Sequence, residues 1–348
     1  MDIKTRGRVL LLTAFVLLSW CPSRFAAGQT LDSQFAVSRS KLVEDNALVG
    51  RVPYLAVLAD GRFAVASNNS LVILFDSLGS ELSPIGSHGG GPGEYRNVLK
   101  LDVRGDTVVA WDAAGFQYLA YSADGELLWQ RGGFTESSFK FAYANGMIAQ
   151  YLVGRRRAHY LLLYDVARGV YVRSFGLRTP AHDVMMNAGS SGGVAFWNDK
   201  FYFVGPAEPV VHWVDPSTFE TGSFDVPDSR FKTSKFEGRD GKREDIVEYL
   251  SHRSIVGDLM PLEDYLVVQI EDGYTPSNSD EVGKDRALRL FFFDKHDRFV
   301  REVSVEGGLP FGVPARRLAA ANGSCFYNLS TARGEDGDAV FFRNAICL

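Results

Sequence analysis

Two patterns of apolar residues dominate the chain. One is a short continuous apolar run, and the other is an alternation of apolar and polar residues. Glycine, asparagine and aspartate interrupt the runs at close intervals, and helical spacing of apolar residues is scarce. Successive side chains of a strand point to opposite faces, so this alternation is typical of strands joined by tight turns. The pattern therefore predicts an all-β chain.

One strand pattern recurs six times along the sequence. Its last aromatic or apolar residues are Phe75, Tyr121, Tyr164, Val214, Phe293 and Phe342. Four of the five steps between these positions are 43–50 residues long, and the remaining step is 79 residues long. Repeats of this length are typical of propeller blades.

A hairpin precedes each repeat, with turns such as Asp60-Gly61 and Asn145-Gly146. These residue pairs tolerate the positive φ angles that tight hairpins require. Each blade is then a meander of four strands, lettered A to D along the chain. We expect an all-β, six-bladed β-propeller of four-stranded antiparallel blades.

The last repeat extends only to a third strand, which ends at Cys347-Leu348, whereas the strand-like segment 34–42 has no partner. We expect this N-terminal strand to complete the sixth blade and close the ring, since closure removes open strand edges. Cys325 lies in the same repeat as Cys347. An oxidising compartment permits these two cysteines to pair, but their spacing alone leaves the pairing open.

The first 28 residues have the pattern of a cleaved export signal. Basic residues at positions 4–8 precede an apolar run at 9–20, and the small residues Ala26-Ala27-Gly28 follow it. The apolar run is too short to span a bilayer, which takes about 20 helical residues. We expect residues 1–28 to be removed and residues 29–348 to form a single propeller domain.

We expect the protein to be exported to the periplasm or to the extracellular space. Lipid attachment at Cys21 is the alternative, but Trp20 stands where such a site needs a small residue. Removing residues 1–28 takes away four basic residues and one acidic residue, so the formal net charge moves from −5 to −8. This acidity disfavours nucleic acid as a partner.

Residues 86–95 carry the strongest break in the sequence, with five glycines and one proline. Within them, Gly91, Pro92, Gly93, Glu94 and Tyr95 follow each other directly. This run resembles the Gly-Pro-Gly-Glu-aromatic signature of exported bacterial six-bladed β-propellers related to NHL-repeat proteins. The resemblance implies the fold, and because that family is mostly uncharacterised it implies no activity.

The position of this stretch predicts a crossing between the first and second blades rather than a phosphate cradle. A cradle would need the lysine and hydroxyl residue of a P-loop, and Pro92 removes one amide that would bind an anion. We expect Glu94 to accept hydrogen bonds from amides of its own loop and Tyr95 to pack between blades.

Strand direction alternates within a blade, so A–B and C–D turns emerge on one face of the ring and B–C and D–A connections on the other. The long, chemically varied loops all fall on the second face, including insertions at 228–253 and 271–286. Binding residues favour loops on a rigid scaffold, so we expect this face and the channel mouth to be functional. The candidate ligand-binding residues are His88, Trp111, Asp112, Arg155, Arg156, His182, Asp183 and Tyr274.

Three of these candidates also have a structural interpretation. Asp112 ends a strand and is suited to capping a turn. Arg155 and Arg156 form a basic point that suits a carboxylate, sulfate or phosphate group, although arginines at a hairpin tip also serve solubility.

No catalytic constellation is visible in the sequence. The chain lacks a Gly-x-Ser-x-Gly elbow, a close histidine pair and a calcium-loop spacing. We therefore expect no cofactor, with one divalent metal such as calcium or zinc in the central channel as the alternative. The leading hypothesis is a non-catalytic propeller that binds a small molecule, glycan or peptide. The alternatives are a metal-dependent lactonase, esterase or lyase, and a protein-interaction scaffold that docks a partner through 228–253.

Overall fold

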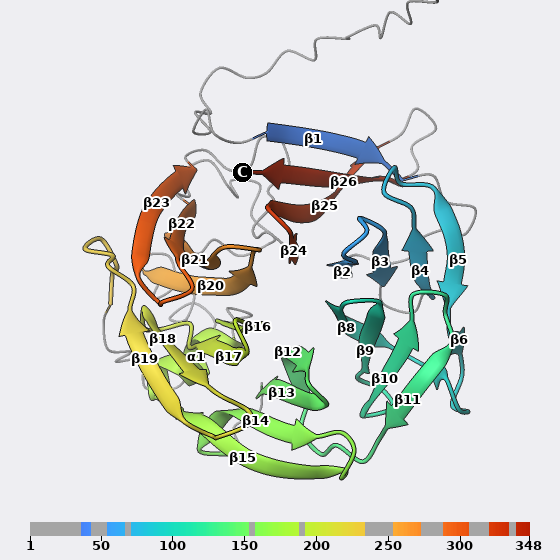
Figure 1. The fold of residues 1–348 in the computed structure, drawn as a ribbon, viewed down its shortest axis with the longest axis horizontal. Helices are drawn as coiled ribbons and strands as arrows, with labels where there is room; N and C mark the ends of the chain where they lie inside the picture. The colour runs from blue at the N-terminus through green and yellow to red at the C-terminus, as the bar shows by residue number, and fades with distance from the viewer. Residues whose placement is uncertain are drawn as a thin grey trace, which may run out of the picture.

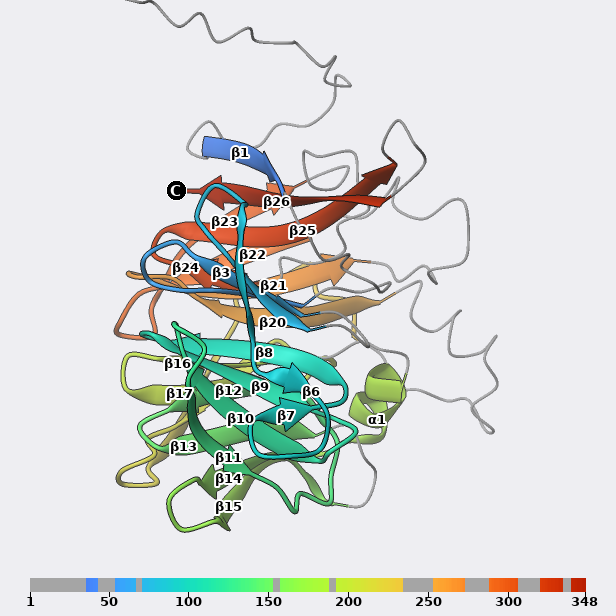
Figure 2. The same cartoon turned by 90° about the vertical axis from the view of Figure 1, so that its right-hand side faces the viewer.

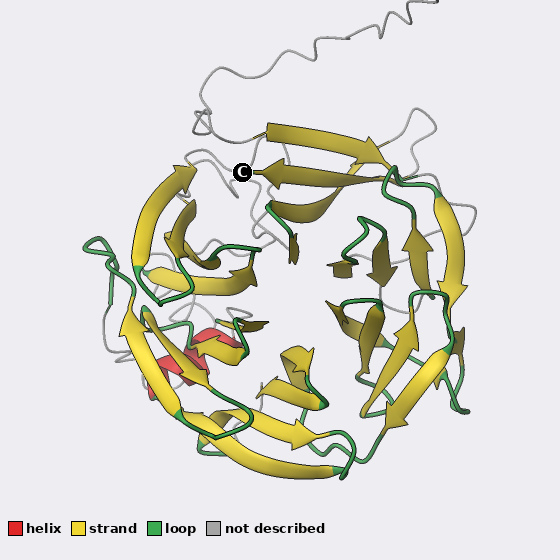
Figure 3. Ribbon diagram, in the orientation of Figure 1, coloured by secondary structure: helices red, strands yellow, loops and turns green. Residues whose placement is uncertain are grey.

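Six four-stranded antiparallel sheets stand around a central axis in a computed structural model of the chain (Figure 1). The structure describes residues 36–42, 54–66, 71–152, 157–187, 192–233, 253–272, 288–305, 320–333 and 339–348. The arrangement confirms the six-bladed β-propeller expected from the repeats. Strands dominate the described residues, whose single helix is α1 (Pro180–Asn187) (Figure 3).

The first three blades follow the chain in order. Blade 1 contains β2 (Tyr54–Val57), β3 (Phe63–Ala66), β4 (Val72–Phe75) and β5 (Glu81–Ile85). Blade 2 contains β8 (Val98–Arg104), β9 (Thr107–Asp112), β10 (Gln117–Ser122) and β11 (Leu127–Arg131). Blade 3 contains β12 (Ser138–Ala144), β13 (Met147–Leu152), β14 (His159–Asp165) and β15 (Val170–Leu177).

The other three blades complete the circle. Blade 4 contains β16 (Gly193–Trp197), β17 (Lys200–Val204), β18 (Val210–Val214) and β19 (Thr221–Asp225). Blade 5 contains β20 (Ser254–Pro261), β21 (Leu266–Asp272), β22 (Leu288–Phe293) and β23 (Phe299–Val305). Blade 6 contains β24 (Ala320–Asn322), β25 (Cys325–Arg333), β26 (Ala339–Cys347) and β1 (Ala36–Lys41).

The N-terminal strand closes the ring, as expected. β1 pairs antiparallel with β26, with a register that runs from Ala36 opposite Cys347 to Lys41 opposite Phe342. Cys325 lies opposite Cys347 on the other side of β26, and a disulfide joins the two. The sixth blade is therefore assembled from both ends of the described chain.

The innermost strand of each blade is its first one: β2, β8, β12, β16, β20 and β24 lie nearest the axis in Figure 1. Tight turns join each of them to the second strand. Asn198 and Asp199, for example, adopt φ angles of 45° and 61° between β16 and β17. Asparagine and aspartate tolerate these angles better than most residues, which is why the turn pairs could be recognised in the sequence.

The hydrophobic core is divided into six clusters, and each lies between two neighbouring blades. One joins blades 1 and 2 through residues such as Leu74 and Leu119, and another joins blades 6 and 1 through Phe341 and Phe75. The remaining four occupy the other interfaces around the ring. Burial of apolar area therefore fixes each blade to the next and leaves the axis itself without a core cluster of its own.

Several sequence predictions lie outside the described residues. They include the export signal at 1–28 and most of both insertions; of these, residues 228–233, Arg253 and residues 271–272 are described. Among the described residues, no helix has the length and apolar character that a membrane span requires. Seen from the side in Figure 2, α1 lies at one face of the disc.

Candidate functional site

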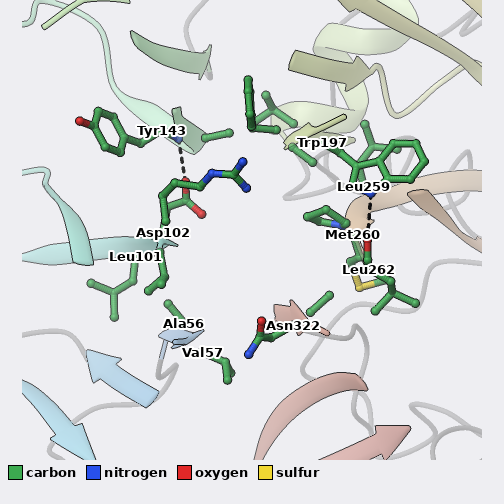
Figure 4. Close-up of a pocket in the computed structure, with 18 of the residues that line it drawn as sticks. Ala56, Val57, Leu101, Asp102, Tyr143, Trp197, Leu259, Met260, Leu262 and Asn322 are labelled. Carbon is green, nitrogen blue, oxygen red and sulfur yellow. Dashed lines mark hydrogen bonds between the residues drawn. The ribbon is translucent and has the colours of Figure 1, made fainter. Parts of the chain in front are cut away.

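A cavity of about 450 Å³ lies on the propeller axis. The innermost strands of all six blades contribute to its wall (Figure 4). Its rim includes A–B turn residues of five blades, which are Ala59, Gly105, Asn198, Glu263 and Gly323. The cavity therefore occupies the A–B turn end of the channel, and sequence reasoning, which looked to the other face, missed it.

Lys140 and Asp258 mark the deep end of this cavity. Lys140 Nζ lies 2.7 Å from Asp258 Oδ2 and donates to the carbonyl oxygens of Gly192, at 2.8 Å, and Gly257, at 3.0 Å. These contacts join blade 3 to blade 5 past the start of β16. An ammonium group has three hydrogen-bond donors, so these three acceptors satisfy it within the protein.

One side of the cavity carries three charged residues at alternate positions of β8, namely Lys100, Asp102 and Arg104. Asp102 reaches the next blade, where its Oδ2 accepts a hydrogen bond of 2.7 Å from the amide of Tyr143. Burial raises the pKa of Asp102 to about 6, against the opposing effects of the Tyr143 amide and the charges of Lys100 and Arg104. This carboxyl group therefore changes its charge near neutral pH.

The guanidinium of Arg104 lies over the ring of Phe196, with Cζ 4.8 Å from the ring centroid. Phe196 belongs to β16, so the arginine side chain extends from blade 2 toward blade 4. Neither Arg104 nor Lys100 forms an ion pair with any residue that the structure describes. A cation–π contact of this kind engages no N–H group of the guanidinium in a conventional hydrogen bond.

The side of the cavity opposite β8 includes apolar side chains beside Asp258 and Glu263. Leu259, Met260 and Leu262 line it from blade 5, across the cavity from Leu101 and Asp102 in Figure 4. Trp197 fixes the position of this wall, because its Nε1 donates a 2.8 Å hydrogen bond to the carbonyl oxygen of Leu262. Apolar side chains of blade 5 thus lie across the cavity from the charged residues of β8.

Two of the candidates from the sequence, Trp111 and Asp112, lie beneath the crossing between blades 1 and 2. Trp111 is fully buried among aromatic rings, and Asp112 is 1% exposed. Asp112 Oδ1 accepts from the amide of Asn97 at 2.9 Å, while Oδ2 accepts from Gln117 Nε2 at 2.9 Å. Both carboxylate oxygens of Asp112 therefore stabilise the local fold through hydrogen bonds.

Other contacts secure the crossing itself. Gly91 N donates to Glu94 Oε2 at 2.7 Å. The buried hydroxyl of Tyr95 donates to the carbonyl oxygen of Ile85 at 2.7 Å and accepts from the amide of Val72 at 2.8 Å. His88, in the short strand β6 (Ser87–His88), pairs in parallel with β7 (Glu94–Tyr95) and is exposed. In this stretch, His88 is the sequence candidate with a side chain open to solvent.

His182 and Asp183 lie together in α1, which connects blades 3 and 4. His182 is 3% exposed and its ring stacks on Tyr160, with centroids 4.5 Å apart. Burial lowers its pKa to about 4, and the nearby charge of Arg178 acts in the same direction. Asp183 pairs with Arg178 at 2.6 Å. Neither residue lines the cavity, while Arg155, Arg156 and Tyr274 lie outside the described residues.

A second group of charges is enclosed at the roots of the two insertions. Arg289 is fully buried, and its guanidinium pairs with Asp228 and, at 2.6 Å, with Asp272. The hydroxyl of Ser254 donates to Asp272 at 2.5 Å and accepts from the amide of Lys232. These contacts tie the described ends of the insertions to blade 5, while Asp228 Oδ2 and Arg289 Nε are buried without a hydrogen-bond partner among the described residues.

No group of three His, Cys, Asp or Glu side chains within the described part of the chain has a geometry that could hold a metal ion. The prediction about cofactors, including calcium or zinc in the channel, stays a prediction.

Two solved structures resemble the whole fold. A member of the DUF4221 family from Bacteroides vulgatus gives a TM-score of 0.62 at 10% sequence identity, covering 89% of this chain and 96% of that one. A Bacteroides fragilis protein named as a candidate exported protein gives 0.58 at 16% identity, covering 92% and 97%. At these identities the similarity shows the fold alone.

No family model and no curated protein sequence matches the chain. The fold and the site together define a six-bladed β-propeller with an axial cavity. The narrower resemblance of residues 91–95 to NHL-related propellers stays a prediction.

Proposed function

We propose that the chain is an exported, non-catalytic binding protein that takes a small molecule into the axial cavity. The observation that carries this proposal is a cavity of about 450 Å³ whose wall combines apolar side chains with a few charged groups. Small-molecule sites typically have volumes of about 300–1,000 Å³ and this mixture of surfaces. Export is supported by the signal pattern at 1–28 and by the fold shared with the Bacteroides fragilis protein.

The test blocks the cavity mouth without disturbing the core. Ala59 is exposed at the rim, so Ala59→Trp places an indole there. Ala167→Trp is the matched control, since Ala167 is an exposed residue of a C–D turn on the same face and does not line the cavity. The purified chain is screened against a library of small molecules by thermal shift, and binding is then measured by calorimetry.

We expect compounds that bind the unmodified chain to bind Ala167→Trp equally well and Ala59→Trp at least tenfold more weakly. Equal binding to all three proteins would place the site elsewhere and refute the proposal.

The metal-dependent enzyme and the protein-interaction scaffold are the remaining hypotheses. A stoichiometric metal in the purified protein would support the enzyme. Loss of a co-purifying partner on deletion of 234–252 would support the scaffold.

A further inference from the structure

The cations that line the axial cavity differ in whether they have partners. Lys140 pairs with Asp258 at 2.7 Å, and Lys295 pairs with Asp264 at 3.1 Å. Lys100 and Arg104 have no such partner among the described residues. The cavity therefore contains two positive charges on one strand that form no ion pair within the described part of the chain.

The anion nearest to these two cations neutralises them only partly. Asp102 lies between them on β8, and one of its oxygens is already engaged by the amide of Tyr143. Of the other carboxylates that line the cavity, Asp258 is paired with Lys140, and Glu263 is exposed in the A–B turn of blade 5. An added negative charge is consequently stabilised most strongly at the β8 side of the cavity.

The guanidinium of Arg104 is available to bind such an anionic group. This guanidinium contacts the ring of Phe196, while its N–H groups make no hydrogen bond to the described residues. A planar guanidinium can bind two oxygens of one carboxylate, sulfonate or phosphate group at once. Lys100 lies four residues before Arg104 on the same face of β8 and adds a second positive charge.

The opposite wall fits the rest of such a ligand. Leu259, Met260 and Leu262 line this wall with the small part of their apolar surface, 3–4%, that the inter-blade clusters leave exposed, and the carboxylate of Asp258 beside them is paired with Lys140. A molecule bound across the cavity would bury its apolar part against blade 5 and direct its charged end toward blade 2.

We propose that the axial cavity selects an amphipathic anion, with its carboxylate, sulfonate or phosphate group bound by Arg104 and Lys100 and its apolar body against Leu259, Met260 and Leu262. This inference rests on the proposed function and specifies the ligand class for the same cavity. Charge, and not only size, then decides what binds.

Three probes with the same octyl chain test the ligand class: octanesulfonate, 1-octanol and octyltrimethylammonium. Binding of each to the mature chain is measured by isothermal titration calorimetry at pH 7.5 and low salt. We expect octanesulfonate to bind at least tenfold more tightly than 1-octanol, and octyltrimethylammonium to bind most weakly. Added salt should weaken binding of the sulfonate and leave that of 1-octanol nearly unchanged.

Substitutions assign the charged end of the ligand. Arg104→Gln and Lys100→Gln should each weaken octanesulfonate binding about tenfold without changing the affinity for 1-octanol. Arg298→Gln is the matched control, because Arg298 is an exposed arginine of a C–D turn on the same face, paired with Asp294 at 2.7 Å. It should leave both affinities unchanged.

The outcomes separate the two proposals. If 1-octanol and octanesulfonate bind equally and Ala59→Trp abolishes both, the cavity binds small molecules but the anionic ligand class is wrong. If octanesulfonate binds tightly and neither Arg104→Gln nor Lys100→Gln weakens it, the assigned head-group site is wrong. If none of the three probes binds, the amphipathic anion is overturned, and the library screen decides the proposed function separately.

Discussion

Asp102 and His182 titrate in the same pH range and act on the free energy of unfolding with opposite signs. Burial raises the pKa of Asp102 from 3.8 to about 6 and lowers that of His182 from 6.5 to about 4. The Asp102 contribution to stability is therefore present below about pH 4 and is lost as the pH rises through 6. The His182 contribution is present above about pH 6.5 and is lost as the pH falls toward 4.

The substitution Asp102→Asn separates the two effects. Asparagine keeps a carbonyl oxygen that can accept from the amide of Tyr143, but it does not titrate. A difference of one in pKa corresponds to about 1.4 kcal/mol, so ionising Asp102 costs up to about 3 kcal/mol. Asp102 lines the cavity and is partly exposed, so solvent screening reduces this cost, and we expect about 1.5–3 kcal/mol.

The measurable quantity is the free energy of unfolding of Asp102→Asn minus that of the unmodified chain, from urea denaturation at pH 4, 5, 6 and 7.5. Contributions from all other groups, including His182, largely cancel in this difference. We expect it to increase by about 1.5–3 kcal/mol from pH 4 to pH 7.5. Asp106→Asn, at an exposed position of the turn that follows β8, should give a nearly constant difference. A constant difference for Asp102→Asn as well would refute the reasoning.

Three further predictions follow from buried polar groups. His182→Gln should change the corresponding difference by up to about 3 kcal/mol in the opposite direction between pH 4 and pH 7, and a pH-independent difference would contradict the assignment. Arg289→Gln leaves two enclosed carboxylates without their cation and should lower the free energy of unfolding by about 3–5 kcal/mol, whereas the exposed Arg298→Gln should change it little. Tyr95→Phe removes the hydroxyl between an amide and a carbonyl and should cost about 1–3 kcal/mol in urea denaturation; an unchanged midpoint would mean that water replaces it.

The blades could be predicted from the sequence because their signals are local. Asn145-Gly146 marks a hairpin within two residues, and the alternation on either side identifies its strands. Ring closure could be predicted from the number of strands. The last repeat contained three strands instead of four, and the strand-like segment 34–42 belonged to no repeat. The structure confirms this with the pairing of β1 and β26.

The cavity, in contrast, could not be predicted from local sequence signals. Its wall is assembled from six repeats that lie far apart in the sequence, and which face of each inner strand points to the axis depends on how the blades pack. One signal was present: Lys100, Asp102 and Arg104 alternate in a strand that its place in the repeat makes innermost. Charges at alternate positions of an inner strand identify residues that face the channel.

Ring closure also fixes the order of events in assembly. A ribosome delivers the N-terminal part of a chain first, so β1 exists long before β26, its partner. Until then the strand edges at the junction are unpaired, and they can associate with other chains. Cys347 lies between Ala36 and Cys325, opposite both. Docking of the first strand and formation of the disulfide thus both wait for the nine residues of β26, and a chain stalled before them remains an open arc.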